Sequence, residues 1–293
     1  MKNKITTLLL FLVFLAGLSL LLYPTVSDYW NSFTQSRAIA SYADEVAGMD
    51  TDKYAALWDD AIAYNQALPS RSNPYVLTAA QEAEYDDLLN LSGTGIMGYV
   101  EIPTIACSLP VYHGTGDSVL QVAAGHIEWS SLPVGGESSH CVISGHRGLP
   151  SAKLFSDLDK LVEGDIFILR VLDEVLTYQV DKILIVEPDE TENLTITEGM
   201  DYCTLVTCTP YGINTHRLLV RGHRIENLAE SKAIRITADA VQIDPMVVAP
   251  IALIPFLLLF MCILILTDNT NPKYKDETVS KTNKHGGDPH ETI

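Results

Sequence analysis

The chain has 293 residues, of which 47% are hydrophobic, and it carries a formal net charge of −18. This length suits one sizeable domain with accessory segments, and the apolar content excludes a largely disordered chain. Binding to nucleic acid needs clustered Lys and Arg, so a chain with 19 basic and 37 acidic residues is expected to take no nucleic-acid partner.

The first predicted element is an apolar segment, residues 5–23, which follows Lys2 and Lys4. Its length suits a membrane span, which needs about 20 apolar residues. A signal peptide has the same basic-then-apolar pattern, but Tyr23-Pro-Thr-Val-Ser27 does not match the small-residue cleavage pattern. An uncleaved anchor is therefore favoured, with residues 1–4 in the cytoplasm, and on either interpretation the chain that follows is exported.

Residues 24–97 form a region with helical patterning. From Asp52 to Leu68 the apolar residues recur on one face, as an amphipathic helix requires. Thr78 and Gln81 have the spacing of a capping box, which predicts the start of a second helix that runs to residue 91. Residues 69–75, between the two helices, are a loop by composition.

Short β-rich segments follow from Gly98 and define a predicted domain over residues 98–230. Glycine, proline and aspartate separate these segments, so a barrel or sandwich of strands is expected. A short helix is predicted over residues 153–161, where apolar side chains gather on one side. The predicted strands are 98–102, 139–144, 165–171, 175–186, 203–209 and 216–225.

A second apolar segment, residues 246–267, contains no charged residue and is long enough for a membrane span. It is too far along the chain to be a signal peptide. Residues 231–245 would connect it to the barrel, and residues 268–293 would form a polar cytoplasmic tail. By the positive-inside rule both ends of the chain lie in the cytoplasm and the domain between them lies outside. The basic residues that flank the two spans are Lys2, Lys4, Lys273, Lys275, Lys281 and Lys284.

The five cysteines are odd in number and lack the spacing of a zinc site, so neither a disulfide framework nor a metal site is expected. Cys107, Cys141 and Cys203 lie in apolar, strand-like contexts and are predicted core residues, with an unrecognised disulfide as the alternative. Cys208 differs, because the predicted hairpin brings it near Arg217, and a cationic neighbour favours the reactive thiolate. Cys203 and Cys208 are five residues apart, so a regular strand turns them to opposite faces.

A histidine that moves a proton would complete such a site, and Ser144-Gly-His-Arg-Gly148 offers His146 at the end of a strand-like segment. His216 is adjacent to Arg217, and neighbours on a strand point to opposite faces, so we expect it to point away from the site. His126, which follows a glycine, is kept as a supporting candidate behind the site. The full set of competing histidines is His113, His126, His140, His216 and His223.

Two of these segments closely resemble the sortases, specifically the class C or pilin-polymerising branch. They are Val206-Thr-Cys-Thr-Pro-Tyr-Gly-Ile-Asn-Thr-His-Arg-Leu-Leu-Val-Arg221 and Ser144-Gly-His-Arg-Gly-Leu-Pro150. Further matching segments, 98–103, 109–115 and 132–136, occur in the family's order, and the resemblance covers roughly residues 30 to 270. It implies a mainly β fold: a sortase-type closed β-barrel with N-terminal helices, flanked by two transmembrane helices.

The resemblance also implies chemistry. Cys208 would be the nucleophile, His146 the general acid and base, and Arg217 the group that steadies the substrate carbonyl or its oxyanion. No metal or organic cofactor is implied. The donor would be a pilin or surface protein with an LPxTG-like sorting signal, cleaved between Thr and Gly, and the acceptor would be a lysine of a pilin subunit, joined through an isopeptide bond. The expected location is the membrane of a Gram-positive cell, with the catalytic domain outside.

Class C sortases carry an N-terminal lid, usually Asp-Pro-aromatic, whose acid pairs with the catalytic arginine and whose ring covers the cysteine. Asn73-Pro74-Tyr75, in the loop near residues 70–76, stands at the matching position. The asparagine brings no charge, so its hydrogen bond to Arg217 would be weaker than a charge-assisted one and the lid should open more readily. The alternative is a simple turn with a packed tyrosine.

Three other functions remain open. The domain could attach proteins to a cell-wall amine, or it could act as a protease with water as the acceptor. A rival of a different class is a noncatalytic, membrane-tethered assembly scaffold. The lid and the second span favour pilin polymerisation.

Overall fold

The computed structural model describes residues 2–71, 75–91, 93–227, 257–258 and 261. Two compact units divide the chain, Met1–Ile243 and Asp244–Ile293. In the second unit the described residues, Leu257, Leu258 and Met261, are helical. The rest of the predicted second span, the connector before it and the polar tail lie outside the described residues, so these three segments stay predictions.

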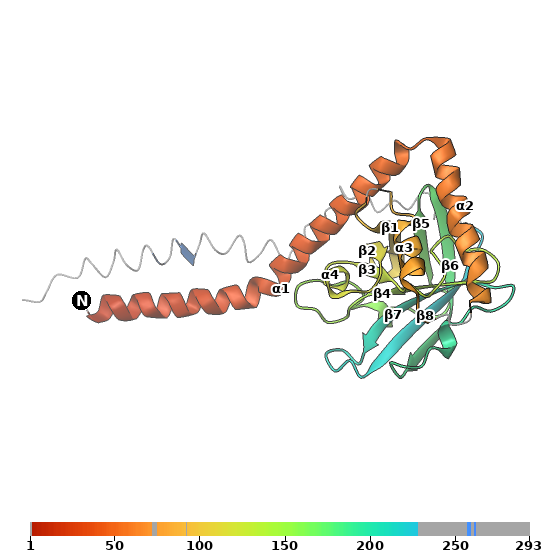
Figure 1. Ribbon diagram of the computed structural model, residues 1–293. Coiled ribbons are helices and arrows are strands. Elements are labelled where there is room, and N and C mark those ends of the chain that lie inside the picture. The colour runs from red at the N-terminus through yellow and green to blue at the C-terminus, as the bar shows by residue number, and fades with distance from the viewer. Residues whose placement is uncertain (1, 72–74, 92, 228–256, 259–260, 262–293) are drawn as a thin grey trace, which may run out of the picture. The chain divides into compact units, whose positions relative to one another are not determined.

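In the first unit, eight strands close into a barrel in the order β1-β2-β3-β4-β7-β8-β6-β5 (Figure 1). The β2–β3 and β4–β7 pairs are parallel, and the other pairs are antiparallel. The predicted mainly β, closed-barrel fold is thus confirmed. The strands are β1 (Ile96–Ile102), β2 (Cys107–His113), β3 (Ala124–His126), β4 (Ser139–Ser144), β5 (Ile166–Val171), β6 (Glu174–Val186), β7 (Asp201–Thr209) and β8 (His216–Ile225).

Sequence patterning missed β2 and β3 and placed a helix where there is none. Pro110 inside β2 removes a backbone donor and weakens the strand signal, and β3 has only three residues. The helix predicted over residues 153–161 is wrong: only the 3₁₀ turn η3 (Leu158–Lys160) forms there. Leu154 has φ 40°, which a right-handed helix does not allow, and the Phe155 N–H bonds to the His146 carbonyl at 3.1 Å instead of to its own segment.

The N-terminal helices begin and end close to where the sequence predicts. The capping box is present, because the Thr78 hydroxyl accepts from the Gln81 N–H and the Gln81 side chain accepts from the Thr78 N–H. The helix it opens stops at Asp87, before the predicted residue 91, and Leu89 has φ 59°. The helices and 3₁₀ turns besides η3 are α1 (Lys2–Ala47), α2 (Thr51–Ala67), η1 (Leu68–Ser70), α3 (Ala79–Asp87), η2 (Pro103–Ile105), α4 (Asp117–Leu120) and η4 (Glu192–Leu194).

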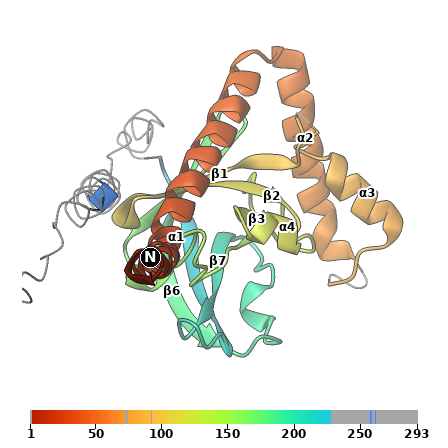
Figure 2. The same cartoon turned by 90° about the vertical axis from the view of Figure 1, so that its left-hand side faces the viewer.

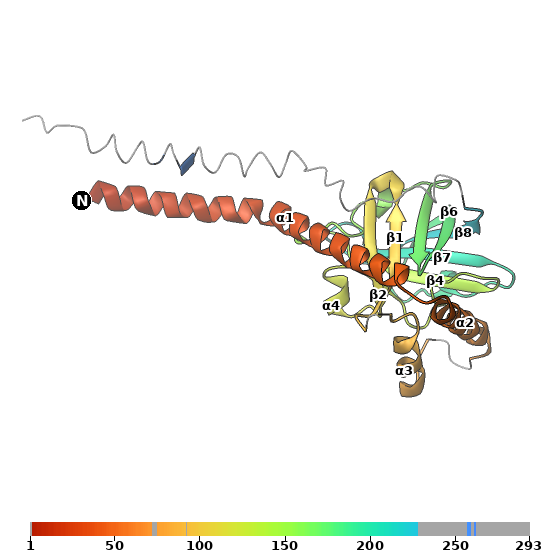
Figure 3. The same ribbon diagram turned by 90° about the horizontal axis from the view of Figure 1, so that it is seen from above.

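One helix, α1, carries both the predicted membrane span and a contact surface for the barrel. Its most apolar window has a mean hydropathy of 2.6 and is long enough to cross a membrane. The helix continues past Pro24, and its C-terminal half lies against β1 and β2 (Figures 2 and 3). There the Tyr42 hydroxyl donates to the Met97 carbonyl at 2.9 Å and accepts from the Leu172 N–H at 2.7 Å. The helix that contains the predicted anchor is therefore bonded directly to the barrel.

Buried polar contacts also fasten α2 to the barrel. The Asn65 side chain is 5% exposed and pairs with the backbone of Leu132 twice: it donates to the carbonyl at 3.1 Å and accepts from the N–H at 2.7 Å. Around this pair, Tyr64 and Tyr85 pack with Met97 in one apolar cluster between the helices and the sheet. Asn65 thus satisfies the N–H of a loop residue that has no strand partner and shares its carbonyl with the Val134 N–H.

Replacing Asn65 with alanine should destabilise the folded chain by about 1–3 kcal/mol, because the buried Leu132 N–H loses its partner, whereas the Leu132 carbonyl keeps the bond from the Val134 N–H. Urea denaturation of the detergent-solubilised protein measures the change. Gln66→Ala is the matched control, since Gln66 is the exposed neighbour on the same helix and should change stability by less than about 0.5 kcal/mol. Equal effects of the two substitutions would contradict the assignment.

Candidate active site

The β7–β8 hairpin places Cys208 directly opposite Arg217 on the neighbouring strand. Side-chain faces alternate along both strands: Leu205 and Leu218 pack inside the barrel, whereas Val206 and Leu219 belong to an apolar cluster on its outside. Cys208 is two residues after Val206 and Arg217 is two residues before Leu219, so both lie on the outer face. Directly opposed side chains on one face are about 5 Å apart at Cβ, within contact distance of each other.

His146 lies in the turn that follows β4, the strand paired with β7 on the side opposite to β8. The parallel β4–β7 register pairs Ser144 with Val206. One residue further, the Gly145 N–H donates to the Val206 carbonyl at 3.0 Å and the Thr207 hydroxyl donates to the Gly145 carbonyl at 2.7 Å. The three residues predicted to act together thus come from the turn after β4, the end of β7 and the start of β8.

The β7–β8 loop holds the Arg217 side chain with its own backbone. One guanidinium nitrogen donates to the carbonyls of Asn214, at 3.3 Å, and His216, at 3.1 Å. His216 itself forms an ion pair with Glu187, with 3.2 Å between Nε2 and Oε1. That partner lies just after β6, so the contact removes His216 from the set of histidines that face Cys208.

The other histidines act as structural hydrogen-bonding groups. His126 is fully buried, and its ring nitrogens lie 3.0 Å from the Tyr85 hydroxyl and 2.8 Å from the Ser131 carbonyl, so it ties α3 to the barrel. His140 bridges the Thr195 carbonyl and the Thr204 hydroxyl at 2.9 and 2.8 Å. Burial lowers the pKa of His140, which favours the neutral ring that such bridging uses. His113 is held in the same way by two backbone carbonyls, and His223 lies at the far end of β8.

The cysteines differ sharply in environment. Cys203 faces the barrel interior with zero exposure, as the alternation along β7 predicts, whereas Cys208 is half-buried. Burial raises the pKa of Cys107 to about 12 and that of Cys203 well above its usual value. Those two thiols therefore stay protonated, and unreactive, at neutral pH. All four described cysteines are free thiols, so the alternative of a disulfide among them is not present.

An apolar cluster lies on the outer side of β4, β7 and β8, and a cavity lies toward the ends of β4 and β7 that are farther from Cys208. Val142, Val206 and Leu219 are buried members of this cluster, and Trp129 packs against them. Trp129 also lines a cavity of about 530 Å³, between η1, the loop after β3 and the β6–β7 connection. A volume of this size admits several residues of an extended peptide, since ligand clefts are typically a few hundred Å³ or more.

The predicted lid is described only in part. Asn73 and Pro74 lie outside the described residues, so their contact with Arg217 stays a prediction. Tyr75 lines the cavity, and its ring meets the Trp129 ring edge-on with 5.2 Å between centroids. The third residue of the predicted lid segment therefore packs on Trp129 in this cavity.

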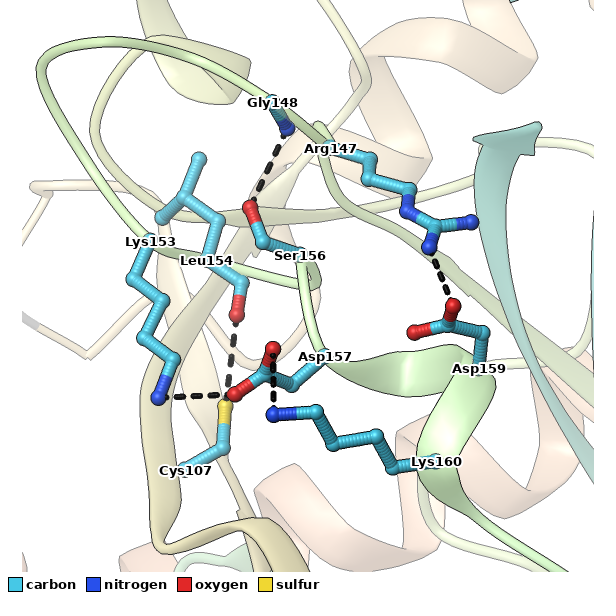
Figure 4. Close-up of polar contacts among 9 residues, drawn as sticks. All are labelled: Cys107, Arg147, Gly148, Lys153, Leu154, Ser156, Asp157, Asp159 and Lys160. Atoms are coloured by element: carbon cyan, nitrogen blue, oxygen red, sulfur yellow. Dashed lines mark hydrogen bonds and ion pairs between the residues drawn. The ribbon is translucent and has the colours of Figure 1, made fainter. Parts of the chain in front are cut away.

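Sequence patterning missed a group of residues that hold the turn after His146. Arg147 forms an ion pair with Asp159 in η3 and donates to the Thr209 hydroxyl at 3.3 Å. The Gly148 N–H donates to the Ser156 hydroxyl at 3.1 Å (Figure 4). Arg147 belongs to the Ser144–Gly148 motif, but no sequence pattern links it to Asp159, twelve residues later. The helix predicted over residues 153–161 hid this contact.

Within the described ranges, no three histidine, cysteine or acidic side chains gather closely enough to hold a metal ion. The ends of the strands offer instead a thiol paired opposite a guanidinium, with an imidazole in the turn after the neighbouring strand β4. Those are the groups that acyl transfer through a thioester uses: a nucleophile, a proton carrier and a cationic donor.

Comparison with known proteins agrees with this arrangement. A family model described as a sortase domain matches residues 100–225. A crystal structure of sortase C1 from Streptococcus agalactiae is 51% identical, with a TM-score of 0.64, and the match covers 66% of this chain and 100% of that one. Sortase C from Streptococcus pneumoniae is 48% identical, with a TM-score of 0.60, over 65% of this chain and 97% of that one. Sortase D of Bacillus subtilis is 31% identical over 131 residues, 44% of this chain and 63% of the relative.

The chain belongs to the sortase family, whose members are cysteine transpeptidases. Its similarity to solved sortase C structures places it in the class C branch. The match to Bacillus subtilis sortase D spans just under two thirds of that relative's length.

The environments of the thiols predict selective alkylation. Iodoacetamide at pH 8 should modify Cys208 and leave Cys107, Cys141 and Cys203 unmodified. Burial raises the pKa of Cys107 and Cys203, and the Cys141 thiol is buried out of reach of the reagent, although hydrogen bonds with Cys203 and His126 lower its pKa. Peptide mass spectrometry of the folded protein identifies the modified residue, and 6 M guanidinium chloride provides the control in which these three thiols react as well. Early labelling of Cys203 without denaturant would contradict the assignment of β7 faces.

Proposed function

We propose that the protein is a membrane-anchored transpeptidase that cleaves an LPxTG-like sorting signal between Thr and Gly and joins the acyl fragment to a lysine of a pilin subunit. The observation that carries the proposal is the cross-strand pairing of Cys208 with Arg217, with His146 in the turn that follows β4, the other strand paired with β7. Membership of the class C sortases supports the same reaction.

The first half of the reaction forms a thioester. Cys208 passes its proton to His146, and the thiolate attacks the threonine carbonyl carbon while Arg217 donates to the oxygen that gains negative charge. When the oxyanion collapses, the bond to the glycine nitrogen breaks and His146 returns the proton to the leaving amine. The C-terminal fragment departs, and the N-terminal fragment stays attached through Sγ of Cys208.

The second half transfers the acyl group. The neutral ε-amine of a lysine attacks the thioester carbonyl, and Arg217 again donates to the oxyanion. His146 takes the proton from the attacking nitrogen, the thiolate of Cys208 leaves, and an isopeptide bond remains. No cofactor takes part, since neither oxidation nor phosphate transfer is involved.

The outer face fits the apolar part of such a donor. An extended peptide with Leu and Pro before the reacting Thr would place these two side chains against Ile127, Trp129 and Leu184, the half-buried residues that pack on the outer apolar cluster. Burial of apolar area of this kind gives about 25 cal/mol per Å². The charged and polar parts of the signal would meet Arg217 and the β7–β8 loop.

Two features favour a pilin as the partner. The similar sortase C of Streptococcus pneumoniae is described with respect to its pilin substrate specificity, and another similar structure is that of sortase C1 of a pilus island. The segment Asn73-Pro74-Tyr75 stands where class C enzymes carry a lid, and Tyr75 packs on Trp129. A cell-wall amine and water remain the alternative acceptors.

The proposed location is the cell membrane, with the barrel on the outer side. The apolar part of α1 is the anchor, and the polar contacts of its C-terminal half fix the barrel to it. The second span, residues 246–267, completes the proposed topology, with both ends of the chain in the cytoplasm. His126 is assigned a supporting role, because its contacts join α3 to the loop at Ser131.

Incubating the detergent-solubilised protein with an LPxTG-type peptide should give an adduct on Cys208 equal in mass to the acyl fragment. The adduct should be absent in Cys208→Ala, and its rate should fall about 10²–10³-fold in Arg217→Ala, which lacks the oxyanion donor. Intact-protein mass spectrometry measures both. The result would instead establish a noncatalytic scaffold if the folded protein gave no adduct with any sorting-type peptide and the Cys208→Ala variant still supported pilus assembly.

Adding a pilin lysine peptide, a cell-wall type amine or no amine then separates the three acceptors. We expect the isopeptide product with the lysine peptide to form faster than the other amide or the hydrolysed acid. Preference for the wall-type amine would identify an anchoring enzyme, and preference for water a protease.

The lid gives a separate prediction. Asn73→Asp should slow adduct formation by roughly tenfold, because a charge-assisted bond to Arg217 is stronger than a neutral one by about 1 kcal/mol or more. Ser72→Asp adds the same charge one residue away and is the matched control, expected to change the rate less than about twofold. A variant lacking residues 70–76 should form the adduct faster than the unmodified chain. If deletion leaves the rate unchanged, the segment is a turn and not a lid.

A further inference from the structure

We infer that Arg147 is a positioning residue that holds the His146 turn against the strand end that carries Cys208. The inference rests on the proposed function, because it assigns a purpose to the alignment of those two residues. Arg147 follows His146, and its hydrogen-bond partner Thr209 follows Cys208. The contact therefore joins the two segments one residue beyond each reacting group.

The guanidinium reaches three separate segments at once. One terminal nitrogen donates to the Thr209 hydroxyl at 3.3 Å, and the other forms the ion pair with Asp159 in η3 (Figure 4). The group also lies 5.7 Å from the centroid of the Tyr211 ring, which belongs to the β7–β8 loop. The strand end, the 3₁₀ turn and the hairpin loop thus meet at one side chain.

The backbone of the turn depends on this side chain for its link to β7. Regular pairing with β7 ends at Gly145, and past that point the main-chain partners come from the turn's own downstream segment. The His146 carbonyl accepts from the Phe155 N–H at 3.1 Å, and the Gly148 N–H donates to the Ser156 hydroxyl at 3.1 Å. These bonds stiffen the turn internally but do not tie it to the cysteine strand. Arg147 supplies that tie.

Packing around the turn leaves little room for a compensating shift. The Phe155 ring is fully buried and lies so close to Gly145 that a Cβ there would come within 2.6 Å of it. On the other side, Gly148 has φ 76°, and a Cβ there would stand 3.3 Å from the Tyr211 ring. The turn is therefore tightly packed on both sides, and the Arg147 side chain sets the position of its backbone.

The contacts of Arg147 are better suited to aligning its partners than to stabilising the fold. Its side chain is 8% exposed, and the partner carboxylate of Asp159 is 45% exposed. The buried Nε–H has no hydrogen-bond partner among the described residues. An ion pair that buries a cation and leaves one donor unpaired is a poor means of stabilising a barrel. A planar fork that spans two partners at fixed angles is a good means of aligning them, and a lysine cannot reproduce it.

Arg221 provides a matched control for the experiment. It lies four residues after Arg217 on β8, pairs with both carboxylate oxygens of Asp181 at 3.0 and 2.9 Å, and stacks over the Tyr202 ring at 4.1 Å. The chemistry is the same as at Arg147: a fork, a carboxylate and an aromatic face. None of these partners belongs to the His146 turn.

The test compares Arg147→Lys with Arg221→Lys in the detergent-solubilised full chain. With an LPxTG-type peptide, Arg147→Lys should lower kcat for acyl transfer by about 10- to 100-fold, as a small misplacement of a reacting group does, with KM changed less than twofold. Alkylation of Cys208 at pH 10, which needs no histidine, should stay within twofold of the unmodified protein. Arg221→Lys should leave kcat, KM and alkylation within twofold.

A second readout needs no activity. Hydrogen exchange followed by mass spectrometry should show faster exchange over residues 145–156 in Arg147→Lys and no change there in Arg221→Lys. If Arg147→Lys fails to fold, Asp159→Asn provides the same comparison from the half-exposed partner. Unchanged kcat in a folded Arg147→Lys, or unchanged exchange over the turn, would overturn the inference. Absence of any acyl adduct in the unmodified protein would overturn the proposed function instead, and the exchange comparison would still decide the role of Arg147.

Discussion

Parallel pairing of β4 with β7 is the constraint on which the rest of the site depends. The register that sets Ser144 beside Val206 ends β4 two residues before His146, at a point on β7 two residues before Cys208. The antiparallel β7–β8 hairpin adds Arg217 opposite Cys208 on the other side. A one-residue slip in either pairing would turn a reacting side chain toward the barrel interior, because side-chain faces alternate with a period of two.

Closure of the barrel makes that register hard to change. Phe167 and Tyr178 stack in the interior with 5.5 Å between ring centroids, and no strand edge is left open to slide. The interior is therefore reserved for packing, and chemistry is confined to the outer face. Cys203 and Cys208 illustrate the division: both are on β7, but one is a fully buried, protonated thiol and the other a half-buried one.

The helices before the barrel are fastened by buried polar contacts more than by apolar packing alone. Asn65 pairs with the backbone of Leu132, and Tyr85 bonds to His126. These contacts hold α2 and α3 on either side of the segment that contains Asn73 and Tyr75. The proposed lid would need fixed ends to move, and both helices that flank its segment are pinned to the sheet. The C-terminal half of α1 is attached in the same manner, through Tyr42.

The sequence by itself determined the β-rich domain, most strand bounds and the residue types of the site. Alternating apolar residues and turn-forming glycine and proline are local signals, and so is the capping box at Thr78. Local patterns also separated Cys203 from Cys208, because a period of two needs only the strand. The same reasoning failed for residues 153–161, where the positive φ of Leu154 and the bond from Phe155 to His146 come from contacts that spacing does not encode.

Only the tertiary structure decided which distant segments meet. The β4–β7 pairing joins residues about sixty positions apart, and no local signal sets its register. Arg147 and Asp159 became partners because the chain between them folds back as a loop and a 3₁₀ turn, not as a helix. His126 moved from a candidate near the thiol to a buried link between α3 and the barrel for the same reason. Residue types and periodicity are properties of neighbouring positions, whereas the alignment of a thiol, an imidazole and a guanidinium depends on long-range strand pairing.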